Sequence, residues 1–164
     1  MEEQNFRKIV TAAVVAALCC IATMIIQIPS PMNGYVNLGD SIVLLAGWIL
    51  GPVYGTLAAA IGSMLADLLA GYPHYAIATF LIKGAIALCA AFICPKITDS
   101  AWKRILSGLV GETLMVIGYF GFAALILGNG FSAAASIPGN IIQGIVGIIA
   151  AYALFYGLKK TKLF

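Results

Sequence analysis

Long apolar runs dominate this chain and decide what it can fold into. Hydrophobic residues make up 62% of its 164 residues and charged residues only 9%, whereas an ordinary soluble domain carries about 25% charged residues. A soluble fold of this length could not cover so much apolar surface. Runs of about 20 apolar residues are long enough to cross the roughly 30 Å hydrocarbon core of a bilayer as helices. The sequence therefore predicts an all-α integral membrane protein.

Turn-forming residues divide the apolar sequence into six segments. Pro29, Pro31 and Gly34 end the first segment, and Gly51-Pro52 separates the second from the third. The expected spans are about 7–28, 38–50, 52–70, 75–94, 105–127 and 135–157. The second span is short, so it must begin earlier or lie beside a thinned or protein-lined region. We therefore expect residues 1–164 to form a single transmembrane domain, a six-helix bundle.

The positive charges predict how this bundle is oriented. Eight of the nine lysines and arginines fall on one side of a six-span protein: Arg7, Lys8, Lys96, Lys103, Arg104, Lys159, Lys160 and Lys162. The loops expected on the other side, 29–37, 71–74 and 128–134, carry none. Positively charged loops stay in the cytoplasm, so both termini are predicted to be cytoplasmic. Charges arranged in this way do not indicate nucleic-acid binding.

Polar side chains lie inside the expected spans, where they are costly. The ninth cation, Lys83, would be in the fourth span, with Glu112 in the fifth and Asp67 near the outer end of the third. Helical spacing groups the polar residues into stripes: Tyr75, Thr79 and Lys83; Glu112, Met115 and Tyr119; Asn140, Gln143 and Gly147; Thr56, Ser63 and Asp67. We expect these stripes to face a common interior that is open towards the outside, with Asp67, Lys83 and Glu112 as its buried ionic groups.

Each of these residues also has a purely structural interpretation. Lys83 and Glu112 could form a buried ion pair. Asn140 and Gln143 could hydrogen-bond neighbouring helices. Asp67 could lie at the level of the lipid headgroups. Ionisable side chains inside a membrane are more often functional, however.

The sequence contains no motif of an enzyme or a metal site. GxxxxGK[ST], HExxH and GxSxG are absent, and these motifs bind nucleotide phosphates, bind zinc or carry a nucleophilic serine. Four cysteines, Cys19, Cys20, Cys89 and Cys94, lie in apolar runs without the spacing of metal ligands. We therefore expect no catalytic residue, no metal and no cofactor.

Small residues on the first span form a further pattern. Ala12, Ala13, Ala16 and Ala17 give two overlapping AxxxA steps. Small residues at this spacing let another helix approach closely. The partner helix could belong to this bundle or to another protein.

One long stretch resembles a known family of membrane proteins. Residues 35–87 read YVNLGDSIVLLAGWILGPVYGTLAAAIGSMLADLLAGYPHYAIATFLIKGAIA, and residues 138–147 read PGNIIQGIVG. NLGD, the GP pair, the GS and AD pairs and ATFLIKG resemble the S component of an energy-coupling factor (ECF) vitamin transporter. The resemblance is strongest to the hydroxymethylpyrimidine- or pyridoxine-type branch.

The resemblance implies a binding subunit that works with partners. An S component is a six-helix protein of the cell membrane that captures a vitamin from outside and does not hydrolyse ATP. It docks on a transmembrane T component carrying two cytoplasmic ATPases, and is thought to topple within the bilayer. The family docks through AxxxA on its first helix, which Ala12/Ala16 and Ala13/Ala17 both match.

The resemblance also implies where the ligand binds. The family pocket lies in the outer half, between helices 4 to 6 and the outer loops, with loop 1 as a lid. The residues expected to bind the ligand here are Tyr35, Asn37, Tyr75, Thr79, Lys83, Tyr119, Asn140 and Gln143. Lys83 is expected at the pocket floor, where it pairs with Glu112 or meets an acceptor on the ligand.

Several alternatives stay open from the sequence. Riboflavin and pantothenate are other ligands of S components, and a lone lysine would suit the anion pantothenate. A self-sufficient proton-coupled carrier would also use acidic residues in its spans. A membrane enzyme is a third class, for which no constellation of nucleophile and base is visible.

Overall fold

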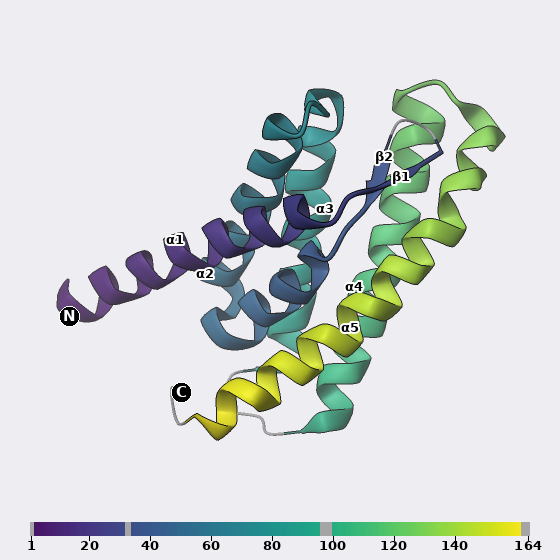
Figure 1. Cartoon of the computed structure of the whole chain (residues 1–164). Coiled ribbons are helices and arrows are strands. Elements are labelled where there is room, and N and C mark those ends of the chain that lie inside the picture. Colours follow the sequence, from purple (N-terminus) through teal and green to yellow (C-terminus); the bar gives the residue numbers. More distant parts are fainter. Residues whose placement is uncertain (1, 32–33, 96–99, 162–164) are drawn as a thin grey trace.

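The structure is a computed structural model that describes residues 2–31, 34–95 and 100–161. In chain order its elements are α1 (Glu2–Ile25), β1 (Ile28–Ser30), β2 (Gly34–Val36), α2 (Gly39–Leu69), α3 (Pro73–Ile93), α4 (Ala101–Gly121), the π-helical turn η1 (Phe122–Ile126), the 3-10 helix η2 (Gly130–Ser136) and α5 (Ile137–Lys160). The described part has five helices long and apolar enough to cross a membrane. Figure 1 shows them gathered into one bundle. Lys96 and Lys162, two of the predicted cytoplasmic cations, lie outside the described residues.

The longest helix, α2, folds back on itself at Gly51. Gly51 has φ 78° and ψ −171°, a backbone conformation that glycine adopts readily and other residues rarely. Pro52 follows and has no N–H to continue the helical hydrogen bonds. Beyond the bend, Gly55 lies against the backbone of Ala46, a contact that a straight helix cannot make. The second and third expected segments are thus two arms of α2, on either side of Gly51.

Small residues allow the helices to pack closely. A Cβ added to Gly62 of α2 would overlap the carbonyl oxygen of Ala16 in α1. Gly47 of α2 lies in the same way against the backbone of Ala87 in α3. Backbones can approach to this distance only where side chains are absent or small. The glycines of α2 therefore set its distance from both neighbouring helices.

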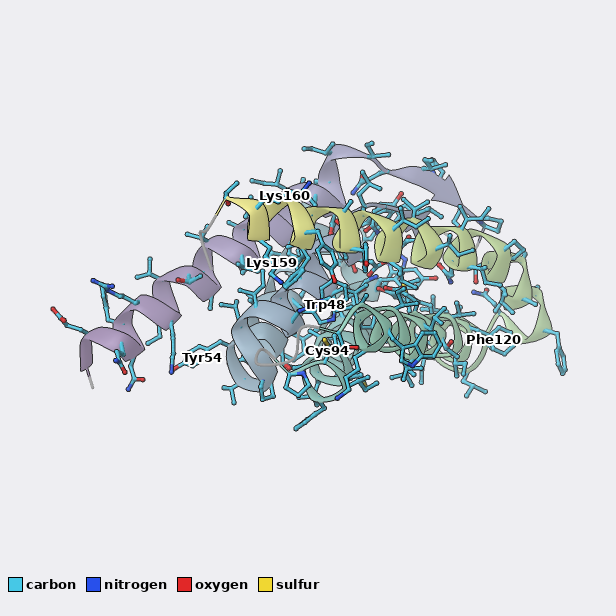
Figure 2. The ribbon with its side chains drawn as sticks, turned by 90° about the horizontal axis from the view of Figure 1, so that it is seen from below. Trp48, Tyr54, Cys94, Phe120, Lys159 and Lys160 are labelled. Carbon is cyan, nitrogen blue, oxygen red and sulfur yellow. The ribbon has the colours of Figure 1, made fainter. Side chains whose placement is uncertain are left out.

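Trp48 is one of the largest fully buried side chains of the core, which also includes Cys94 (both labelled in Figure 2). Trp48 donates a hydrogen bond from Nε1 to Ser107 Oγ at 2.9 Å and meets the ring of Phe155 edge-on at 6.0 Å. Arg104, which the sequence places in a loop, lies instead in the first turn of α4 and is buried. Its guanidinium stacks over Phe155 at 3.7 Å, which explains how a cation is accommodated there.

Large apolar side chains cover the outside of the bundle. Phe131 is 93% exposed, Leu125 82% and Ile77 74%. Soluble monomers rarely expose apolar surface on this scale, so lipid is the solvent that these side chains require. The N-terminal end of α1 and the C-terminal end of α5 both lie away from β1 and β2 (Figure 1).

A short antiparallel strand pair departs from the all-α expectation. β1 pairs with β2 so that Ile28 lies opposite Val36 and Pro29 opposite Tyr35. Strands of three residues are too short to show an alternating pattern in the sequence. The pair belongs to loop 1, for which the sequence predicts an ordered cover.

We predict that Gly62→Ala lowers thermal stability, because the new Cβ overlaps the Ala16 carbonyl and forces α1 away from α2. Overpacking of this kind costs about 1–3 kcal/mol. The matched control is Gly157→Ala in α5, where no described atom lies within 4 Å of the added Cβ and helix propensity alone favours alanine. Melting temperatures in detergent should fall for Gly62→Ala and stay level or rise for Gly157→Ala. An unchanged melting temperature for Gly62→Ala would contradict the close packing.

Candidate functional site

A cavity lies where β1 and β2 meet the ends of the helices. Its lining residues are Ser30, Pro31, Gly34, Tyr35, Asn37, Asp67, Tyr75, Thr79, Tyr119, Ser136, Asn140 and Gln143. Seven of the eight residues predicted to bind a ligand are among them, and Lys83 is the exception. The cavity volume is about 40 Å³, which holds a few water molecules at most. The lining must therefore move apart before a ring-sized molecule can enter.

Tyr35 fastens the strand pair to the end of α2. Its hydroxyl donates a hydrogen bond to Asp67 Oδ1 at 2.6 Å, and its ring lies 4.8 Å from that of Tyr72. Burial raises the pKa of the Tyr35 hydroxyl, and the bond to Asp67 adds to this. The hydroxyl therefore remains protonated and keeps its role as donor.

Lys83 pairs with Asp40 and not, as one interpretation of the sequence has it, with Glu112. Lys83 Nζ forms an ion pair with Asp40 Oδ1 and lies 3.1 Å from Met115 Sδ. Both side chains are almost fully buried. Asp40 is not among the residues predicted for the site from the sequence, because the helical spacing that groups residues along one span does not reveal a partner on another. The NLGD motif was the available signal.

Gln143 connects this ion pair to the strand side of the cavity. Its Nε2 donates to Asp40 Oδ2 at 2.6 Å, and its Oε1 accepts from the backbone N–H of Asn37 at 2.9 Å. Asn37 Oδ1 in turn accepts from the N–H of Gly39 at 2.8 Å. The amide of Gln143 lines the cavity, but its hydrogen-bonding groups are already engaged by the protein.

Aromatic rings form another wall. The hydroxyls of Thr79 and Tyr119 are 3.0 Å apart and hydrogen-bonded. The ring of Tyr75 lies 6.1 Å from that of Tyr119 and 5.4 Å from that of Phe122. The predicted stripe of Tyr75 and Thr79 on α3 therefore does meet α4 at the cavity. Flat rings of this kind suit a flat ligand.

The cavity also holds polar groups that the protein leaves without partners. Within the described residues, Asp67 Oδ2 and Ser30 Oγ are buried and accept or donate no hydrogen bond. Buried polar groups are nearly always bonded in native proteins, so these two are the groups most available to a ligand.

Glu112 lies near the ion pair but outside the cavity. It is 6% exposed and contacts the α5 backbone where Gly144 and Gly147 leave room for it. Neither carboxylate oxygen has a hydrogen-bond partner in the described part of the chain. Asp67, Lys83 and Glu112 are thus all buried, and they differ in that only Asp67 borders the cavity.

A second, wholly apolar hollow of about 600 Å³ runs along α1 and the second arm of α2. Its lining includes all four alanines of the AxxxA steps: Ala12, Ala13, Ala16 and Ala17. Ala16 packs on Gly62 within the bundle. Ala13 and Ala17 are exposed. The two registers, equivalent in the sequence, are therefore different in the structure.

The comparisons relate the chain to membrane transport proteins. A family model described as "ECF-type riboflavin transporter, S component" matches residues 3–160. An uncharacterised protein of Pyrococcus woesei is 38% identical over 142 residues, which are 85% of this chain and 93% of that protein. The thiamine precursor transporter HmpT of Lactococcus lactis subsp. cremoris is 28% identical over 165 residues, covering 99% of this chain and 94% of HmpT.

The fold is also similar to that of a solved structure of an S component. That structure is described by the words "Structure and mechanism of the S component of a bacterial ECF transporter". It superposes with a TM-score of 0.75 at 26% identity and covers 98% of this chain and 99% of that one.

We predict that Lys83→Met is strongly destabilising, because it leaves the Asp40 carboxylate buried and unpaired. Removing one partner of a buried ion pair costs about 3–5 kcal/mol. The double variant Asp40→Asn/Lys83→Met removes both charges and should recover most of this loss. Melting temperatures of both single variants and the double variant test the pairing. If the double variant is destabilised by the sum of the two single effects, Asp40 and Lys83 are not partners.

Proposed function

Because the chain belongs to the family of S components of ECF-type riboflavin transporters, we propose that it captures a small vitamin precursor from outside the cell and delivers it to an ATP-driven partner module. The family consists of transporter subunits and not of enzymes. The chain is accordingly a multi-pass protein of the cell membrane.

The proposed ligand is a hydroxymethylpyrimidine- or pyridoxine-type compound. The observation that carries this proposal is the cavity beside the strand pair, where tyrosine rings surround a few unpartnered polar groups. A small, flat ring with nitrogen and hydroxyl groups matches such walls. The similarity to HmpT, which is named a thiamine precursor transporter, supports the pyrimidine.

Riboflavin is the second candidate, because the matching family model carries its name. Pantothenate is less well supported, although a lone lysine would suit an anion. Lys83 is paired with Asp40 and does not border the cavity, so its charge is not offered to a ligand. Asp67, which does border it, repels an anion when ionised.

We assign the strand pair β1–β2 the role of a lid. The cavity is too small for a ring-sized ligand as it stands, and pockets for such ligands span about 300–1,000 Å³. The hydrogen bond between Tyr35 and Asp67 joins the strand pair to α2. Opening of the lid would break this bond and enlarge the cavity.

The proposed topology has six spans with both termini in the cytoplasm. The two arms of α2 count as separate passes, because the chain reverses at Gly51. The distribution of lysine and arginine favours the same orientation. The lid and the cavity then face the outside.

The proposed partners are a transmembrane T component and two cytoplasmic ATPases. The docking face would be the exposed pair Ala13 and Ala17, because Ala16 of the other register is engaged by Gly62. The apolar hollow beside these alanines supports docking of an apolar helix. ATP hydrolysis would take place entirely in the partners.

We expect the purified chain alone to bind its ligand. In detergent, hydroxymethylpyrimidine or pyridoxine should raise its melting temperature, because a ligand that binds only the folded state stabilises it. Mass spectrometry of compounds released on denaturation gives an independent readout. Riboflavin and pantothenate serve as comparison ligands.

Two outcomes would contradict this function. If none of these vitamins raises the melting temperature, the proposed role as a binding subunit is contradicted. Uptake into liposomes containing this chain alone would favour the self-sufficient carrier instead.

Bulky residues on the docking face should separate binding from transport. Ala13→Leu and Ala17→Leu are expected to abolish energised uptake in cells and co-purification of the partner module, while ligand binding stays unchanged. Val14→Leu is the matched control, because Val14 is 54% exposed on the same helix but outside the AxxxA steps. Normal uptake by both alanine variants would rule out this face.

A further inference from the structure

The unpartnered carboxylate oxygen of Asp67 points to a more specific ligand chemistry. Asp67 is 4% exposed and borders the cavity. Its Oδ1 accepts the Tyr35 hydroxyl at 2.6 Å, whereas no described group donates to its Oδ2. Because a buried carboxylate needs donors to offset its desolvation, a ligand that binds here should supply one.

The surroundings of Asp67 provide no cation of its own. Within the described residues, no lysine, arginine or histidine forms an ion pair with it. Lys83 is already in an ion pair with Asp40. The lining residues in the described ranges include no lysine, arginine or histidine. The charge that the cavity presents to a ligand is therefore that of a carboxyl group.

A carboxyl group recognises one kind of heterocycle edge particularly well. A ring nitrogen and an adjacent amino group present two hydrogen-bonding groups side by side, and the two oxygens of a carboxyl group can bond to both. The same pair of hydrogen bonds forms whether the proton sits on the ring nitrogen or on the acid. Asp67 Oδ1 still has a free lone pair after accepting from Tyr35, since each carboxylate oxygen has two.

Resting on the function proposed above, we propose that Asp67 determines the specificity of the site by pairing with a ring nitrogen and its adjacent amino group, an edge that the hydroxymethylpyrimidine carries and the other candidate ligands lack. In the 4-oxo analogue the ring nitrogen carries the hydrogen and the oxo group is an acceptor, so the ionised Asp67 carboxylate can pair with this edge through the ring N–H alone. The unpartnered Ser30 Oγ borders the same cavity and is free to bind another substituent of the ring.

This pairing also couples the ligand to the lid. Tyr35 on β2 and the ligand would share one carboxyl group, which lies at the end of α2. A ligand that holds the Asp67 side chain in place also holds the oxygen that accepts the hydrogen bond from Tyr35 of the lid. Tyr35 is a positioning residue in this scheme, while Asp67 touches the ligand.

The experiment compares two ligands that differ at one position. Binding of 4-amino-5-hydroxymethyl-2-methylpyrimidine and of its 4-oxo analogue is measured by calorimetry on the purified full-length chain. The unmodified chain should bind the amino compound at least about tenfold more tightly, as hydrogen bonds to charged groups warrant. Asp67→Asn should lose this preference, because an amide carries both a donor and an acceptor and can pair with the edge of either compound.

The matched control is Glu112→Gln, which neutralises another buried carboxylate that does not border the cavity. Its preference for the amino compound should equal that of the unmodified chain. Tyr35→Phe should release the amino compound faster, through the lost lid contact, and keep the preference. Melting temperatures without ligand verify that each variant is folded.

The outcomes separate this inference from the proposed function. If the unmodified chain binds both pyrimidines equally well, Asp67 does not select the amino group, although the chain still binds pyrimidines. If Asp67→Asn keeps the full preference, the selecting group lies elsewhere and the inference is overturned. If the unmodified chain binds neither pyrimidine but takes another vitamin, the proposed pyrimidine ligand falls together with this inference, while the S-component function stands.

Discussion

The buried ion pair between Lys83 and Asp40 is the interaction on which the outer half of the bundle depends. Neither charge is stable alone in a low-dielectric interior, so α3 and the first turn of α2 must stay together. Gln143 adds α5 to the pair through Asp40, and its Oε1 accepts a hydrogen bond from the backbone N–H of Asn37, the residue that follows β2. Three helices and the entrance to the strand pair are fixed by this one cluster, and the cavity borders it.

The same cluster decides the electrostatic character of the cavity. With the ammonium group of Lys83 neutralised by Asp40, the polar side chains that line the cavity are hydroxyls, amides and the carboxyl group of Asp67. Hydrogen bonds in a water-poor site discriminate more sharply than in solvent, because an unmatched group stays unpaired. The protein thus uses one carboxylate to hold its helices and leaves one oxygen of a second carboxylate without a partner beside the cavity.

Much of the architecture could be predicted from the sequence, and the features that could not be predicted have identifiable physical reasons. Apolar runs and turn residues predicted the helices and the break at Gly51. Helical spacing predicted that Tyr75 and Thr79 share one face of a helix, and both line the cavity. The family resemblance of residues 35–87 is confirmed by the match over residues 3–160. The pairing of Lys83 with Asp40 instead of Glu112 could not be predicted, because spacing along one helix does not reveal the height of residues on another. Strands of three residues left no periodic signal.

The fold-back of α2 has a consequence for how far the cargo has to move. The first arm, between Gly39 and Gly51, is roughly 18 Å long at 1.5 Å per residue, much less than the roughly 30 Å of hydrocarbon. In the orientation proposed above, Gly51 lies at the cytoplasmic face, and the start of this arm, with the cavity beside it, lies well below the outer surface. A molecule captured there would already have crossed part of the bilayer before the proposed partner module acts on it.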